Sequence, residues 1–330
     1  MRIFNGVILS IIALLVLAGC SSGGGSETSG SAPKTPFLGG NDGIDIELLE
    51  GSPPEEVTDG GTLPFQAVVM LKNEGEFDLK RDDVKVDLIG ILPEDFGVSS
   101  GDLTDKRPED DLSPKIRDGE GNIVDPIVTE VAFPDSDNFF NFERSVTGNT
   151  VFVFRADICY KYQTKALSRI CVLRDLINLD KDDICDPSDT KKVFSSASPV
   201  QVNSFKQTVA GRDKISFSFD VSHTGSGDVF KEGDSTSPPA DCPKDSRARR
   251  EKENKVFVSV DTGLSSLRCI GFGESASGYV TLVNGKRTVT CHQELDSGRN
   301  DFETNVDITL DFNYRDNVER EVLVKHLLDS

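Results

Sequence analysis

The sequence predicts an all-β protein in which a leader and a linker precede two tandem antiparallel β-sandwich domains. Short segments of alternating polarity, rich in Val, Ile and Phe, recur along the chain. The second half of the chain also repeats features of the first, and long helical periods are missing apart from a short helix expected near residues 166–179. Period-two alternation of this kind is typical of half-buried antiparallel strands.

The first twenty residues predict export and lipidation. Arg2 supplies a short positive region, residues 7–17 form an apolar core, and Leu17-Ala18-Gly19-Cys20 closes the segment. The core is shorter than the roughly 20 residues of a transmembrane helix and fits a signal peptide. Small residues before Cys20 suit a narrow peptidase site, and its thiol can accept a diacylglyceryl group. We therefore expect a lipid on Cys20 that holds the chain on the extracytoplasmic face of the cell membrane. An ordinary signal peptide or an uncleaved signal anchor is the alternative.

The segment after Cys20 predicts a flexible tether. Residues 21–36 are rich in Gly and Ser and contain no aliphatic side chain larger than alanine. A chain of this composition has an end-to-end distance of about 20–25 Å. The roughly 290 foldable residues that follow suit two domains. The predicted organisation is a signal peptide at 1–19, the lipidated cysteine and tether at 20–42, a first sandwich at 43–189, a linker at 190–199 and a second sandwich at 200–330.

Individual strands follow from the alternation. Apolar residues alternate with others at residues 65–72, 84–89, 215–222 and 306–312, and an apolar run starts another strand at 151–154. Asn284-Gly285 separates the strand segments Val280–Val283 and Lys286–Val289. Asn-Gly between strands favours a type I′ turn, so this stretch is expected to form a hairpin.

An internal repeat predicts the number of domains. Gly75 and Gly225 each follow a strand end and are 150 residues apart. At an offset of about 154, two strand segments are each expected to lead through a turn to a second strand, namely 158–160 to 170–172 and 312–314 to 322–324. Two copies of one sandwich explain both offsets, while a single large jelly roll with coincidental matches is the alternative.

Two long polar insertions interrupt the strands, at residues 99–122 and 231–254. Loops of this length are usually functional or disordered, and the abundance of Asp, Pro, Lys and Arg favours disorder. The basic run at residues 247–252 lies in the second insertion and is expected to be an exposed loop.

The cysteine count predicts disulfides. With Cys20 assigned to the lipid, six cysteines remain, at Cys159, Cys171, Cys185, Cys242, Cys269 and Cys291. An even number in an exported chain favours disulfides over zinc, because no Cys-x2-Cys pair is present. Three fall in each predicted domain, so at least one bond must cross between the domains if all six are oxidised. The hypothesis is that Cys269 pairs with Cys291 and Cys171 with Cys185, which leaves Cys159 and Cys242.

The charge of the chain restricts its partners. A formal net charge of −20 and a pI near 4.6 disfavour nucleic acid and anionic lipid head groups. The membrane is therefore expected to be reached through the lipid anchor alone. The remaining partner class is a protein of the cell surface or envelope.

No pattern in the sequence predicts catalysis. The three histidines, His223, His292 and His326, lack the spacing of a zinc hydrolase. Acidic segments at 135–137 and 180–183 offer oxygen ligands for Ca²⁺, but neither has the central Gly or the position-12 Glu of an EF-hand, so solvated loops are the preferred interpretation. No cofactor and no metal ion is expected.

Several short motifs resemble uncharacterised surface lipoproteins of small-genome archaea of the Woesearchaeota and Pacearchaeota type. The motifs are residues 36–51, Val69-x-Leu71-x-Asn73-x-Gly75, Cys159-Tyr160-x-Tyr162-x-Thr164-x-Ala166, Ser198-Pro199-Val200-x-Val202 and Asn313-Tyr314-Arg315-Asp316. The Val-x-Leu-x-Asn-x-Gly motif is also similar to CARDB-type Ig-like modules. The resemblance implies Ig-like surface domains and no catalytic residue, although His223 stands where the second copy would carry Asn.

Together these features predict a membrane-anchored surface module for protein contact or envelope architecture, without catalysis. A solute- or glycan-binding subunit of a membrane complex is the alternative, and a deep aromatic-lined pocket would favour it. A metal-dependent hydrolase would require at least three converging Asp, Glu or His side chains.

Overall fold

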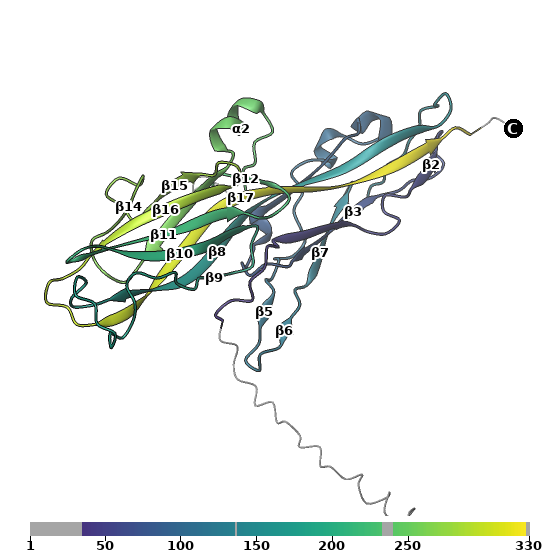
Figure 1. Ribbon diagram of the computed structural model, residues 1–330. Coiled ribbons are helices and arrows are strands. Elements are labelled where there is room, and N and C mark those ends of the chain that lie inside the picture. Colours follow the sequence, from purple (N-terminus) through teal and green to yellow (C-terminus); the bar gives the residue numbers. More distant parts are fainter. Residues whose placement is uncertain (1–34, 136, 233–239, 328–330) are drawn as a thin grey trace, which may run out of the picture. The chain divides into compact units, whose positions relative to one another are not determined.

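The computed structural model describes residues 35–135, 137–232 and 240–327 (Figure 1). The predicted signal peptide, the lipidated Cys20 and most of the predicted tether lie outside the described residues. From Thr35 onward the chain forms one compact unit.

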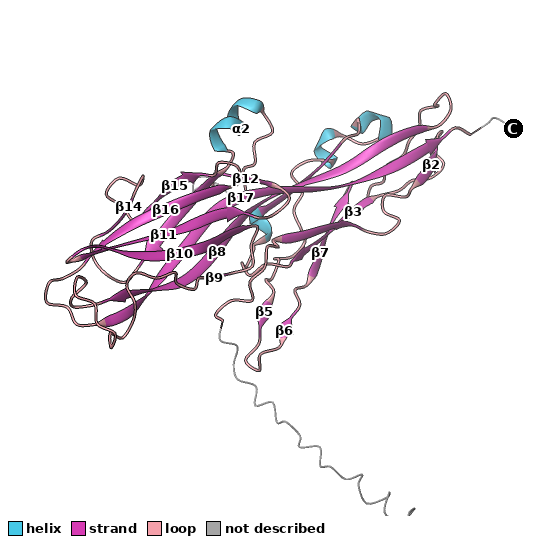
Figure 2. Cartoon of the chain, in the orientation of Figure 1, coloured by secondary structure: helices cyan, strands magenta, loops and turns pink. Residues whose placement is uncertain are grey.

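Strands, nearly all of them paired antiparallel, are the main secondary structure of this unit, and helices are few and short (Figure 2). The strands are β1 (Ile44–Leu48), β2 (Glu56–Thr58), β3 (Ala67–Asn73), β4 (Val84–Ile89), β5 (Ile116–Arg117), β6 (Ile123–Val124), β7 (Val128–Phe133), β8 (Thr150–Val172), β9 (Phe194–Ser195), β10 (Val200–Gly211), β11 (Lys214–His223), β12 (Asp228–Phe230), β13 (Lys255–Asp261), β14 (Leu267–Cys269), β15 (Ser277–Thr281), β16 (Lys286–Glu294) and β17 (Phe302–Lys325). The helical elements are α2 (Ser246–Lys252) and the 3-10 turns η1 (Arg81–Asp83), η2 (Pro93–Phe96) and η3 (Ser100–Asp102). The all-β prediction is confirmed.

The strands form two sandwiches. In the first, the sheet β1-β3-β7 faces β4 and the amino-terminal half of β8, and Phe65 beside β3 contacts Phe154 of β8 at 5.7 Å between ring centroids. In the second, the sheet β10-β11-β16-β14 faces β13, β15 and the amino-terminal half of β17. Gln207 of β10 bridges to β8, because its side chain accepts from the Cys171 N–H at 2.8 Å and donates to the Cys171 carbonyl at 2.7 Å.

Strand pairs of the first sandwich recur in the second with the same register. The pair Ile44↔Asn73 between β1 and β3 corresponds to Val200↔His223 between β10 and β11. Leu71↔Thr129 between β3 and β7 corresponds to Val221↔Arg287 between β11 and β16, and Val86↔Ile158 between β4 and β8 corresponds to Val258↔Leu310 between β13 and β17. The repeat is therefore a repeat of strand pairings. Between β8 and β17 its offset is 152 residues (158 to 310) and not the 154 read from the sequence, so Tyr314 corresponds to Tyr162 and not to Tyr160.

The two sandwiches share their longest strands. β8 and β17 pair antiparallel over the whole of β8, from Thr150↔Val324 to Val172↔Phe302 (Figure 1). β8 starts beside β4 in the first sandwich and ends under β10 in the second, while β17 starts beside β13 and ends beside β2 in the first. The turns expected after residues 160 and 314 are therefore absent, and that prediction was wrong.

The predicted linker is also packed. Within residues 190–199, β9 pairs with β8, and Ala197 and Ser198 are buried. The predicted boundary between β8 and β10 thus does not coincide with a break in the sheet structure.

Several local predictions were wrong or right only in part. The basic run at 247–252, expected as an exposed loop, contains no buried residue but is helical and forms α2. The helix expected near residues 166–179 is strand to Val172, because residues of β8 alternate in burial there. Asn284 and Gly285 adopt the positive φ angles expected of a type I′ turn, 53° and 75°, and Val283 and Lys286 exchange backbone hydrogen bonds across them at 3.0 and 3.2 Å. The predicted turn is therefore present, but the strands do not continue as a hairpin, since β15 pairs with β13 and β16 with β11. The insertion at 99–122 is ordered by burial of Leu103 and Leu112, and only part of the second, 233–239, lies outside the described residues.

Candidate functional site

The six cysteines predicted to form disulfides do so. Cys159 is bonded to Cys242, Cys171 to Cys185 and Cys269 to Cys291, with Cα–Cα distances of 5.9, 5.8 and 3.9 Å. These are the pairs of the sequence hypothesis, and the first of them joins residues on either side of the predicted boundary.

The Cys159–Cys242 bond fixes a loop on the outer face of β8 and β17. The Sγ atom of Cys242 lies 3.5 Å from the Tyr314 carbonyl oxygen, and the Lys244 ammonium donates to Asp87 Oδ2 at 2.9 Å. A cleft of about 250 Å³ opens beside the bond. Its acids Asp87 and Asp157 are paired with Lys244, Lys85 and Arg155, so the cleft offers a ligand no uncompensated charge of either kind.

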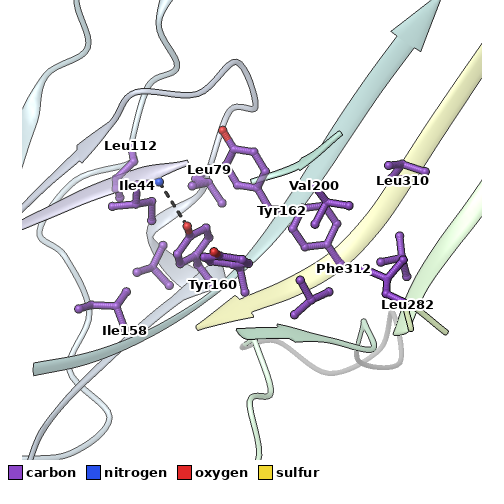
Figure 3. Packing of buried hydrophobic residues seen from close by; sticks show 14 of the residues in the cluster. Ile44, Leu79, Leu112, Ile158, Tyr160, Tyr162, Val200, Leu282, Leu310 and Phe312 are labelled. Carbon is purple, nitrogen blue, oxygen red and sulfur yellow. Dashed lines mark hydrogen bonds between the residues drawn. The ribbon is translucent and has the colours of Figure 1, made fainter. Parts of the chain in front are cut away.

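The middle of the β8–β17 ladder, here called the waist, carries three buried tyrosines (Figure 3). Tyr160 and Tyr162 of β8 face Phe312 and Tyr314 of β17, and neighbouring ring centroids are 5.6–6.4 Å apart. The Ile44 N–H donates to the Tyr160 hydroxyl at 3.3 Å. Burial raises the pKa of all three phenols, so they stay protonated.

Two of these hydroxyls are held in the same way by the two copies of the repeat. In the first copy, Tyr162 donates to Asn73 Oδ1 at 3.3 Å, and Asn73 also binds the Phe77 and Leu112 carbonyls. In the second, the Tyr314 hydroxyl accepts from the Gly227 N–H at 2.7 Å and lies 3.1 Å from His223 Nε2. His223 thus takes the place of Asn73, and burial lowers the pKa of its imidazole.

The repeated glycines, Gly75 and Gly225, leave room for these hydroxyls. A Cβ at Gly75 would overlap the Tyr162 hydroxyl, and a Cβ at Gly225 would overlap that of Tyr314. The sequence signal that revealed the repeat therefore marks the two positions at which backbone and tyrosine approach most closely.

An open cleft of about 730 Å³ lies over the waist. Its rim is polar and acidic, with Asp42, Asp45, Glu74 and Asp316 among the lining residues. Glu74 is neutralised by Lys115 at 2.6 Å and by Lys72 at 2.5 Å, which lower its pKa. The tyrosine rings below are only 1% and 2% exposed, so a ligand in the cleft would meet their edges and no open ring face.

The histidines and the acidic segments are not brought together. His223 is bound to Tyr314, and His326 Nδ1 lies 2.7 Å from Asp59 Oδ2. His292 is in β16 with a buried Nδ1. In the part of the chain that the structure describes, no three His, Cys, Asp or Glu side chains could hold a metal ion.

One surface of the first sandwich was missed by the sequence reading. β7 ends the sheet β1-β3-β7, and the short ribbon β5–β6 precedes it in the chain (Figure 1). Five aliphatic side chains along this stretch are 42–68% exposed: Ile116, Ile123, Val124, Ile127 and Val128. The sequence could not predict that these five residues are exposed. Alternation predicts that the apolar face of a strand is buried, and it does not say which apolar residues stay uncovered in the fold.

No family model and no curated protein matches the chain. Among solved structures, it is similar to Escherichia coli alpha-2-macroglobulin activated by porcine elastase, at a TM-score of 0.17 and 9% sequence identity. The match covers 86% of this chain and 32% of that one, so the chain spans about a third of its length. A likeness this weak carries no argument, and the resemblance to archaeal surface lipoproteins stays a prediction.

The described residues include no helix with the length and apolar character needed to cross a membrane.

Proposed function

We propose that the chain is a lipid-anchored surface protein whose β-sandwich body acts, without catalysis, as a stiff module for protein contact or envelope architecture. The anchor is inferred from the Leu17-Ala18-Gly19-Cys20 motif. The observation that carries the proposal is the β8–β17 ladder, because it makes two sandwiches into one body.

The ladder supports stiffness through its hydrogen bonds. To bend between the sandwiches, β8 (23 residues) and β17 (24 residues) would have to kink at the same place, and the hydrogen bonds between them would break there. At about 3.3 Å per residue, β8 spans roughly 75 Å. The Cys159–Cys242 bond at the middle of β8 adds a covalent brace. A body of this kind transmits position and force, as an envelope strut or a display platform must.

Solute or glycan binding is the second candidate, and the waist cleft is the observation that favours it. Sugars are commonly bound by stacking on aromatic faces, whereas Tyr160 and Tyr314 are buried beneath the cleft. The contact module is therefore the better supported proposal.

Stiffness is tested by pulsed electron spin resonance. Spin labels at Val151 and Arg169, both exposed on β8, are separated by about 60 Å if the strand is continuous. We expect one narrow distance distribution centred there. A broad or two-peaked distribution would show hinged sandwiches and contradict the proposal.

The anchor is tested by mass spectrometry of the membrane fraction. We expect the amino-terminal peptide to begin at Cys20 and to carry a diacylglyceryl group. A peptide that begins at Cys20 without this group, or one that still includes the leader, would reject lipid anchoring.

A further inference from the structure

The sheets β1-β3-β7 and β10-β11-β16-β14 differ in how far other segments cover the outer sides of their edge strands. In the second sandwich, the Cys269 N–H of the edge strand β14 donates to the Ser275 carbonyl at 3.0 Å, and residues 189–191 bind the outer side of β10, where the Lys191 N–H donates to the Phe205 carbonyl at 2.9 Å. In the first, the Arg320 guanidinium donates to the Leu48 and Leu49 carbonyls of the β1 edge at 3.0 and 2.8 Å. Among these four edge strands, β7 alone has no such cover within the described residues.

An uncovered edge strand presents its N–H and C=O groups to solvent. Proteins normally block such edges, because an open edge pairs with any extended segment that reaches it. β7 has no backbone hydrogen bond on the side away from β3 in the described part of the chain, and the one side-chain hydrogen bond to it there is from the Asp110 N–H to the Thr129 hydroxyl at 3.4 Å. The edge is therefore available to a strand.

Apolar side chains accompany this edge. Ile127 is 68% exposed and Val128 42% exposed at the start of β7, and the exposed Ile123 and Val124 of β6 lie just before them in the chain. A two-stranded ribbon such as β5–β6 is marginally stable alone in water, so an added strand would also bury side chains that the ribbon leaves exposed. Backbone and side chains at this site thus favour the same occupant.

Charge selects among extended segments. Glu130 lies in β7, and the Asp110 N–H donates to the hydroxyl of Thr129, the residue before it. Neither acid forms an ion pair within residues that the structure describes, whereas many other surface acids do. A second copy of β7 paired antiparallel in register at Glu130 would set Glu130 against Glu130, and each copy carries a formal charge of −20. Like charges directly opposite across a strand pair are unfavourable, and opposite charges are favourable.

We infer that the open edge of β7, with the adjoining ribbon β5–β6, is a docking site for an extended strand of a partner protein that alternates basic and aliphatic or β-branched residues. This inference rests on the proposed contact function and names its surface. Binding adds one strand to the sheet, as in other cases of β-augmentation.

The site is tested with a seven-residue peptide that alternates Lys and Val and ends in Trp. The chain contains no Trp, so the peptide reports its own environment. The protein is residues 20–330 with Cys20→Ser, which makes the result independent of lipidation. We expect saturable binding, about tenfold tighter than that of the same peptide with Glu for Lys. Hydrogen exchange within residues 128–133 should slow when the Lys peptide binds.

Charge exchange supplies the decisive variant. Glu130→Lys should reverse the preference and favour the Glu peptide, while the matched control Glu321→Lys, on β17 where it pairs with Val153 of β8, should leave it unchanged. Unchanged thermal unfolding verifies that both variants fold. The inference is overturned if neither peptide shows saturable binding, or if the Glu130→Lys and Glu321→Lys variants bind the peptides alike. It is also overturned if no peptide binds but the protein binds anionic vesicles and Ile127→Ser abolishes that binding. This last result would assign the exposed aliphatic residues to membrane contact. Lipid anchoring can fail its own test without affecting this one.

Discussion

The first and second sandwiches have the same strand pairings but fill them differently. In the first, Ala67 pairs with Phe133, and in the second the corresponding pair is Phe217 with Cys291, all four being buried. The large and small members have exchanged sides. Volume conserved across a pair lets the register persist while the residues diverge.

The surrounding cores show the same freedom. Phe65, Phe96, Phe140 and Phe154 of the first sandwich meet mostly edge to face, at 5.2–6.2 Å between centroids. In the second, Phe205 stacks on Phe217 and Phe219, and the Cys269–Cys291 bond occupies the neighbouring space. What the two copies keep is the glycine–tyrosine contact at the waist. The repeat is therefore maintained by close approach at a few positions, and packing elsewhere adapts to it.

The largest effect is expected from the disulfide that joins the copies. Cys159 and Cys242 are 83 residues apart, whereas Cys269 and Cys291 are 22 apart. Chain entropy predicts a loss of about 4–5 kcal/mol for Cys159→Ala with Cys242→Ala, against about 3 kcal/mol for Cys269→Ala with Cys291→Ala. Guanidinium denaturation measures both. An equal or reversed order would mean that the joint between the copies is no stronger than a local brace.

A second comparison uses the repeated glycines. Gly75→Ala would overlap the Tyr162 hydroxyl and place its Cβ 2.8 Å from the Asp42 carbonyl oxygen, and Gly225→Ala would overlap Tyr314. We expect each to reduce the free energy of unfolding by about 2–3 kcal/mol.

Rescue separates the tyrosine contact from other strain. Tyr162→Phe should recover part of the loss in Gly75→Ala but none of the loss in Gly225→Ala. Gly119→Ala is the control, because nothing lies within 4 Å of its Cβ. If the tyrosine substitution rescues neither variant, the glycines are not retained for these hydroxyls.

The smallest effect concerns the residue in which the copies differ. The pKa of His223 is lowered by burial, so the unfolded chain takes up a proton at this position more readily than the folded one. Stability should therefore fall as pH drops below about 6.5, the ordinary value for histidine. His223→Asn, which imitates Asn73 of the first copy, should unfold at a higher temperature than the parent at pH 5.5 and at nearly the same temperature at pH 8. If the variant and the parent differ in unfolding temperature by the same amount at pH 5.5 and at pH 8, His223 does not contribute to the loss of stability in acid.

The sequence predicts the local strand character of this fold well, because alternation records which side of a strand is buried. Segments such as 84–89 and 215–222 are strands for that reason. The same alternation also contradicts the turn that was expected after Tyr160. Residues 161–169 contain no Gly or Pro, and the alternation that starts in the first sandwich continues into the second.

Partners of distant strands are a different matter. Nothing in residues 150–172 specifies that they pair with residues 302–324, because other strands of the chain alternate apolar and polar residues in the same way. The pairing of the six cysteines was a hypothesis among 15 possible connectivities, and the three bonds of the structure agree with it. The open edge of β7 could not be found this way, because an edge is defined by the strand that is absent.

The shared strands also set the order of folding. Thr150 pairs with Val324, and the buried Val322 and Val324 complete the first sandwich from the last strand described. Synthesis delivers β1, β3, β4, β7 and β8 long before β17, so neither half can close while the chain is still growing. Pairing over such separations is slow, because loop entropy must be lost before contacts form. The first sandwich can therefore be completed only after β17 has been synthesised.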